Sequence, residues 1–93
     1  MIKNFSCNES EHIWNGFTST KFPLNIQNVS RRKLRMIDSA ITINDLRIPP
    51  GNHLEKLSGS LNGYYSIRIN NRYRIVFIFE NGDAYNVRIT DYH

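Results

Sequence analysis

The chain has 93 residues, which suffice for one domain with a modest core, residues 1–93, and leave no room for a second. Its 12 Lys and Arg side chains against 8 Asp and Glu give a net charge of +4, which favours anionic partners, nucleic acid first among them. A lone cysteine, Cys7, excludes an internal disulfide, and neither a signal-peptide core nor a membrane-length apolar run is present, so we expect a cytoplasmic protein without a membrane partner.

The first part of the chain predicts a short strand followed by a short helix. Ile2 and Phe5 stand among polar residues, as in an edge strand that joins a sheet formed later in the chain. Asn8 and Glu11 have the spacing of a capping box, which indicates a helix start. Apolar residues follow there at helical spacing: Ile13, Trp14 and Phe17. Gly16 indicates that this helix does not run far.

A longer helix is predicted after the Phe22-Pro23 pair. One set of residues recurs at helical spacing without an intervening Gly or Pro: Ile26, Val29, Lys33, Met36, Ile37, Ala40 and Ile41. The opposite face carries three cations, Arg31, Arg32 and Arg35, and we interpret it as a solvated face rather than a phosphate-binding patch. A short turn within residues 41–46 is expected before Pro49-Pro50-Gly51 stops any helix, and residues 52–57 fit a short strand or extended arm.

The last third of the chain predicts three consecutive antiparallel strands. Residues 64–69 alternate with a period of two, and residues 72–80 are apolar on both sides, which is typical of a central strand. Asn70-Asn71 suits the first turn, and Asn81-Gly82 is a strong hairpin signal for the second. In the final strand, residues 84–90, we expect one face to carry Tyr85, Val87 and Ile89.

Side chains that can act on a phosphodiester gather in the same third of the chain. They are two histidines, His53 and His93, one acid, Asp91, and five cations: Lys56, Arg68, Arg72, Arg74 and Arg88. Adjacent strands lie about 5 Å apart, so residues on neighbouring strands can converge on one groove. The histidines and acids lack the spacing of a metal site, which favours chemistry without a metal ion.

Each of these residues also has a simpler structural interpretation. An arginine in a strand usually pairs with a carboxylate on its neighbour, and a terminal histidine is often only a solvated end. Taken together on one small basic sheet, Arg68, Arg74, Tyr92 and His93 favour a function directed at nucleic acid.

Several segments resemble a known family over nearly the whole chain. They are Met1-Ile2-Lys3-Asn4-Phe5, the run from Pro50 to Leu57, the run from Tyr65 to Ile75, and the ending Asp91-Tyr92-His93. The sequence resembles the RelE-superfamily toxins of bacterial type II toxin–antitoxin systems, and within them the HigB, or plasmid maintenance system killer, branch. The resemblance implies an α+β fold, with two N-terminal helices on a mainly antiparallel sheet formed by the N-terminal strand and the C-terminal meander.

The resemblance also implies an activity and its residues. A HigB toxin is expected to enter the A site of the 70S ribosome and cut mRNA there, without a cofactor. Arg74 matches the arginine that stabilises charge on the scissile phosphate, with Arg68 beside it. Asp91 and His93 match groups assigned to proton transfer, and Tyr92 matches an aromatic residue that stacks on a base. His53 is a further candidate base.

Three cations, Lys56, Arg72 and Arg88, are the expected RNA-binding residues. The family often has a lysine where this chain has Ser58 before Gly59, and Lys56 or His53 is the candidate substitute. The expected partner is a HigA-like helix-turn-helix antitoxin, through which alone the toxin would reach operator DNA. Two other functions remain open: a basic nucleic-acid-binding module without catalysis, and a co-regulator that acts only in complex with its antitoxin.

Overall fold

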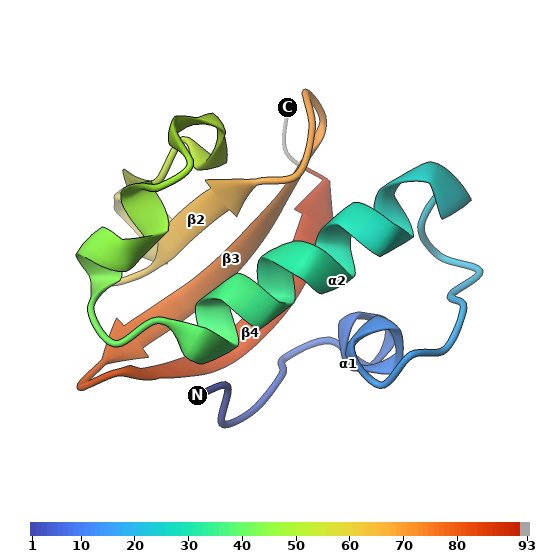
Figure 1. Ribbon diagram of the computed structural model, residues 1–93, viewed down its shortest axis with the longest axis horizontal. Coiled ribbons are helices and arrows are strands. Elements are labelled where there is room, and N and C mark those ends of the chain that lie inside the picture. Colours follow the sequence, from blue (N-terminus) through green and yellow to red (C-terminus); the bar gives the residue numbers. More distant parts are fainter. Residues whose placement is uncertain (92–93) are drawn as a thin grey trace.

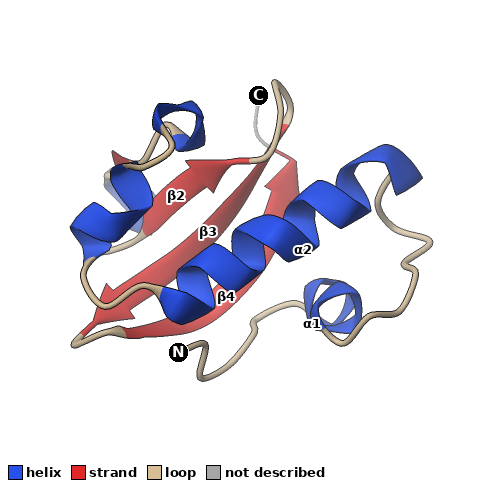
Figure 2. Cartoon of the chain, viewed as in Figure 1, coloured by secondary structure: helices blue, strands red, loops and turns tan. Residues whose placement is uncertain are grey.

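In the computed structural model, which describes residues 1–91, a long helix crosses one face of a four-stranded antiparallel sheet (Figure 1). The helices are α1 (Asn8–Trp14) and α2 (Leu24–Ser39), and the strands are β1 (Glu55–Lys56), β2 (Tyr65–Arg68), β3 (Tyr73–Glu80) and β4 (Asp83–Asp91). Three short 3₁₀ helices, η1 (Ile43–Arg47), η2 (Pro50–Asn52) and η3 (Gly59–Leu61), lie between α2 and β2 in the chain. Figure 2 shows these turns beside the β2 side of the sheet, beyond the end of α2.

The strand order β1-β2-β3-β4 confirms the meander and the central position of β3. β2 and β3 pair with Ile67 opposite Ile75 and with Arg68 opposite Arg74. Asn81 and Gly82 join β3 to β4 with φ angles of 51° and 82°, the left-handed conformation that a tight hairpin turn requires and that Asn and Gly adopt readily.

A β-bulge changes the expected pattern of β4. Val76 lies opposite Arg88 and Ile78 lies opposite Tyr85, so β4 has one residue more than β3 between these pairs. Asn86 lies in the bulge and has a left-handed φ of 53°. The alternation therefore shifts, and Ala84, rather than Tyr85, joins Val87 and Ile89 in the core. The prediction that Tyr85 shares their face was wrong.

Residues 1–6 lie along β4, as predicted, but they do not form a regular strand. Their backbone forms two isolated parallel bridges with β4, Ile2 with Ala84 and Phe5 with Val87. The N-terminal ammonium donates a hydrogen bond to the Gly82 carbonyl oxygen at 2.7 Å. This segment covers an edge of β4 that would otherwise present unpaired backbone groups.

The structure corrects two details of α1. Cys7, not Asn8, precedes the first helical residue, and no side chain caps the helix. Phe17 is 56% exposed and lies beyond the helix, so it is not part of a buried face.

The guanidinium of Arg31 donates hydrogen bonds to the carbonyl oxygens of Ile13 and Phe17 at 2.9 and 2.8 Å. Of the three cations expected to be solvated, Arg31 therefore fastens the end of α1 to α2, whereas Arg32 and Arg35 are exposed.

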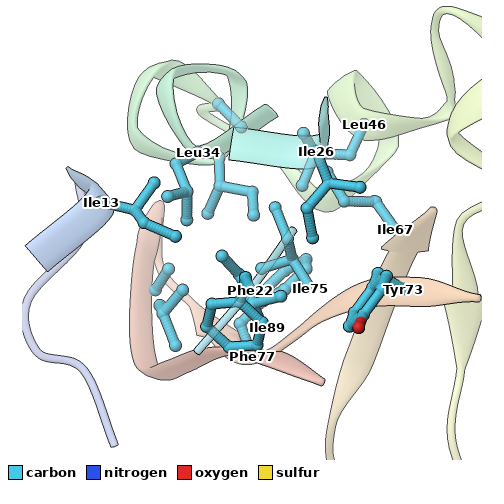
Figure 3. Packing of buried hydrophobic residues seen from close by; sticks show 14 residues of the cluster. Ile13, Phe22, Ile26, Leu34, Leu46, Ile67, Tyr73, Ile75, Phe77 and Ile89 are labelled. Atoms are coloured by element: carbon cyan, nitrogen blue, oxygen red, sulfur yellow. The ribbon is translucent and has the colours of Figure 1, made fainter. Parts of the chain in front are cut away.

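The core fills the space between α2 and the sheet (Figure 3). Ile26, Leu34 and Ile37 contribute from α2, and Ile67, Ile75 and Phe77 contribute from the strands. The expected apolar stripe of α2 ends before Ile41, which follows the helix and is 77% exposed. Within residues 1–91, no helix combines the length and apolar character needed to cross a membrane.

Candidate functional site

A hollow of about 320 Å³ lies where the β2–β3 hairpin meets the segment that precedes β1. Its lining residues are His53, Glu55, Arg68, Asn70, Asn71 and Arg74. Because Ile67 and Ile75 point toward α2, their neighbours Arg68 and Arg74 point to the other face of the sheet. The directly opposed pairing of these two arginines brings two cations into one hollow.

Arg74 is largely buried although its side chain is charged, with only 7% of the residue's surface exposed. Hydrogen bonds hold its guanidinium from two sides. Nε donates to Ser66 Oγ at 2.8 Å, and Nη2 donates to the His53 carbonyl oxygen at 2.6 Å. Glu55 Oε1 lies 3.9 Å from Nη2, at the rim of the hollow. Buried charges need such hydrogen bonds, and here they also fix the direction of the guanidinium.

The hairpin loop that follows β2 shapes the other wall. Asn70 Oδ1 accepts hydrogen bonds from the backbone N–H groups of Arg72 and Tyr73, at 2.9 and 2.8 Å. The Arg68 guanidinium donates to Asn71 Oδ1. The predicted Asn-Asn turn is therefore confirmed, and its side chains both close the turn and line the hollow.

Asp91 lies on the other side of the sheet from the hollow. It pairs with Tyr73 across β3 and β4, and it lines a second hollow of about 330 Å³ together with Lys21, Phe22 and Tyr73. The Arg72 guanidinium binds its carboxylate with three hydrogen bonds of 2.7 to 3.0 Å. These hydrogen bonds and the carboxylate charge raise the pKa of Arg72.

The structure thus brings three of the predicted residues together and separates others. His53, Arg68 and Arg74 share the first hollow. Lys56 lines a third hollow together with Ser58. Arg88 lies opposite Val76, on the same face as Arg74 but outside the residues that line the hollow. Tyr92 and His93 lie outside the described residues.

Sequence reasoning missed several residues that build the site, above all Glu55 and Ser66. Glu55 pairs with Ser66 across β1 and β2. Alternation along residues 64–69 does place Ser66 on the face of Arg68, which was a usable signal. β1 lies within residues 52–57, which were expected to form a short strand or extended arm, but a strand of two residues has no periodicity that shows which face Glu55 occupies. Within residues 1–91, no group of three or more His, Cys, Asp and Glu side chains is arranged to hold a metal ion.

The sequence and the fold both match known proteins. Residues 8–93 match the family model described as the RelE-like toxin of type II toxin–antitoxin system HigB. The chain is 32% identical to the Endoribonuclease HigB of Proteus vulgaris over 93 residues, which cover the whole of both chains. It is 48% identical over 64 residues to Toxin HigB-1 of Vibrio cholerae, which cover 69% of this chain and 67% of the relative.

Solved structures agree with these sequence matches. The structure titled YoeB–YefM complex from Staphylococcus aureus aligns with a TM-score of 0.63 and 25% identity, over 100% of this chain and 95% of the other. The YoeB dimer from Staphylococcus aureus aligns with a TM-score of 0.58 and 22% identity over 100% and 93%, which shows the fold alone. The predicted α+β, RelE-like fold is confirmed. The chain belongs to the RelE-like toxins of type II toxin–antitoxin systems, in the HigB family.

Proposed function

We propose that this toxin is an endoribonuclease that cuts mRNA in the A site of the translating ribosome. The observation that carries the proposal is the hollow in which the largely buried Arg74 and its neighbour Arg68 converge beside His53 and Glu55. Its volume of about 320 Å³ is that of a small-molecule site. The name of the Proteus vulgaris relative, Endoribonuclease HigB, supports the reaction.

The proposed reaction uses the sugar of the RNA itself. The ribose 2′-hydroxyl gives up its proton to a base, and its oxygen attacks the adjacent phosphorus. The bond from phosphorus to the 5′-oxygen then breaks, and an acid protonates the leaving oxygen. The products are a 2′,3′-cyclic phosphate, or its hydrolysed 3′ form, and a 5′-hydroxyl. DNA has no 2′-hydroxyl and is not cut.

Arg74 and Arg68 stabilise the charge that develops on the phosphate oxygens in this proposal. A guanidinium stays charged at any working pH and donates paired hydrogen bonds that match phosphate geometry. Because Ser66 and the His53 carbonyl already orient Arg74, little reorganisation is needed when the phosphate charge builds. These cations supply the positive charge of the site, so the proposed reaction needs no cofactor.

Proton transfer is assigned to titratable groups that line the same hollow as Arg74. His53 and Glu55 line the hollow and are the candidate base and acid among the described residues. His93 keeps the role that the resemblance implies, and Tyr92 that of a stacking aromatic. Asp91, bound by Arg72 on the other face of the sheet, is assigned to holding the end of β4 in place. Lys56, Arg72 and Arg88 are proposed to contact RNA phosphates outside the hollow.

The proposed partner is a HigA-like antitoxin with a helix-turn-helix fold. This proposal is supported by a solved structure of similar fold, which is titled a heterotetrameric complex of the YoeB–YefM toxin–antitoxin from Staphylococcus aureus. Operator DNA would be contacted by the antitoxin within the complex, and the toxin would act in the cytoplasm, where ribosomes translate.

The function is tested by inducible expression followed by primer-extension mapping of transcript 5′ ends, with Arg74→Ala as the matched variant. We expect growth arrest and new ends within codons for the parent, and neither for the variant. Cuts that persist when initiation is blocked would refute ribosome dependence. Growth arrest without fragmentation would favour the non-catalytic binding module.

A further inference from the structure

Lys33 is a buried lysine near the middle of α2, only 6% exposed. Its ammonium donates a hydrogen bond to Asn52 Oδ1. The ion pairs found within residues 1–91 do not include it. Burial, and then the positive charges of Arg32 and Arg68, lower the pKa of Lys33. A buried ammonium with a neutral partner destabilises a fold relative to an apolar side chain of similar volume, so stability alone is a poor reason for it.

Asn52, the partner of Lys33, organises the loop that follows η1. Its side chain is fully buried, and its Nδ2 donates to the carbonyl oxygens of Leu46 and Ile48 at 3.1 and 3.4 Å. Its backbone N–H donates to the Pro49 carbonyl oxygen at 2.9 Å. The Asn52 side chain thus closes residues 46–52 on themselves, while Lys33 ties the closed loop to α2.

His53, the residue after Asn52, connects this loop to the hollow, which it lines. His53 has a φ of 44°, in the left-handed region that only a small fraction of non-glycine residues adopt. In that conformation its carbonyl oxygen accepts the 2.6 Å hydrogen bond from Arg74 Nη2. Contacts therefore run without a gap from the α2 lysine through Asn52 to the carbonyl that orients Arg74.

We propose that Lys33 and Asn52 are positioning residues of the site, which hold the loop of residues 46–52 so that the His53 carbonyl orients Arg74. The inference rests on the proposed function, because the effect on rate follows from Arg74 acting on a phosphate. Displacing a catalytic group by about 1 Å can cost about 100-fold in rate, so a distant contact can matter to catalysis.

Lys33→Met tests the inference, because methionine keeps much of the side-chain length and loses the donor. We expect kcat for ribosome-bound message to fall about 10- to 100-fold, as for other residues that act through a partner, with KM within about twofold of the parent. The Arg74 Nε–H resonance, observed by NMR in the purified toxin, should shift. Arg32→Met, an exposed cation next to it on α2, is the control and should change neither measurement.

Two results would overturn the inference. One is a folded Lys33→Met variant with the parent's kcat and the parent's Arg74 resonance. The other is a rise in KM at constant kcat, which would make Lys33 a contributor to RNA binding. If the parent toxin cleaves no message, the proposed function fails, and the Arg74 resonance still decides whether Lys33 positions that side chain.

A second variant decides the matter if Lys33→Met does not fold. Asn52→Asp keeps an acceptor for the ammonium and gives Lys33 a carboxylate partner, but it removes the donors to the Leu46 and Ile48 carbonyl oxygens. We expect a folded protein with a displaced Arg74 resonance and a lower kcat. A resonance and rate equal to those of the parent would overturn the role of Asn52.

Discussion

Arg74 shows how a largely buried cation can be held in a fixed direction at the wall of a hollow. Two of its hydrogen-bond partners, the Ser66 hydroxyl and the His53 carbonyl, are neutral oxygens, which orient a guanidinium without cancelling its charge. The carboxylate of Glu55 stands farther away, at 3.9 Å, with half of its side-chain surface exposed. This arrangement suits a group that must meet a phosphate in a fixed direction.

Arg74→Ala should lower the rate of cleavage of ribosome-bound message by about 100- to 1,000-fold. The estimate follows from removal of one preorganised donor to a developing negative charge, which costs about 2.7–4 kcal/mol. Single-turnover cleavage by the purified toxin on programmed ribosomes measures it. Arg35→Ala, which removes an exposed cation of α2, is the matched control and should retain the parent rate. Equal losses for the two variants would mean that charge alone, rather than the hollow, carries the effect.

Lys33 should leave a signature in the pH dependence of stability. Burial and the charges of Arg32 and Arg68 lower its folded-state pKa below the ordinary 10.5. Between these two pKa values, the unfolded chain therefore binds more protons than the folded protein does. The free energy of unfolding therefore gains a contribution as pH rises through the folded-state pKa toward 10.5. Urea unfolding of the parent and of Lys33→Met from pH 8 upward should show the parent gaining stability relative to the variant. Parallel pH curves would contradict this prediction.

At the scale of elements, the sequence predicted those strands and turns whose conformation depends on residues close together in the chain. Alternation identified β2 and β3, and Asn81-Gly82 identified the second hairpin, because strand periodicity and turn conformation depend on neighbours in sequence. The bulge at Asn86 was not predictable, because it depends on how β4 aligns with β3. The site was predicted only in part for the same reason: Arg68 and Arg74 face each other across a predicted hairpin, whereas Glu55 reaches them from a strand of two residues.

Gly82→Ala should destabilise the protein by about 1–2 kcal/mol, the usual cost of forcing an L-residue into the left-handed region. The φ of Gly82 is 82°, and an added Cβ would lie 3.3 Å from the Ile41 carbonyl oxygen, so the turn cannot relax easily. Chemical denaturation measures the change. Gly51→Ala is the control, because a Cβ there meets nothing within 4 Å, and its change should stay within about 0.5 kcal/mol. An equal effect of the two substitutions would show that the hairpin conformation does not matter to stability.

At the scale of the whole molecule, RNA could bind through the net charge of +4 or through the hollow, and these two modes of binding predict different effects of single substitutions. A diffuse basic surface attracts RNA through its total charge, so any exposed cation contributes equally. The hollow instead concentrates Arg68 and Arg74 on one face of the sheet, where they can each release a counterion on binding a phosphate.

The salt dependence of affinity for a short single-stranded RNA separates these two mechanisms. For single strands, the logarithm of the binding constant falls against the logarithm of salt concentration by about 0.7 per phosphate contact. Arg68→Ala should reduce that slope by about 0.7, because it removes one contact in the hollow, while Arg35→Ala should leave the slope unchanged. Fluorescence anisotropy at a series of salt concentrations gives both slopes. If both variants lower the slope equally, RNA is attracted by the net charge of the molecule, and the hollow is not where its phosphates bind.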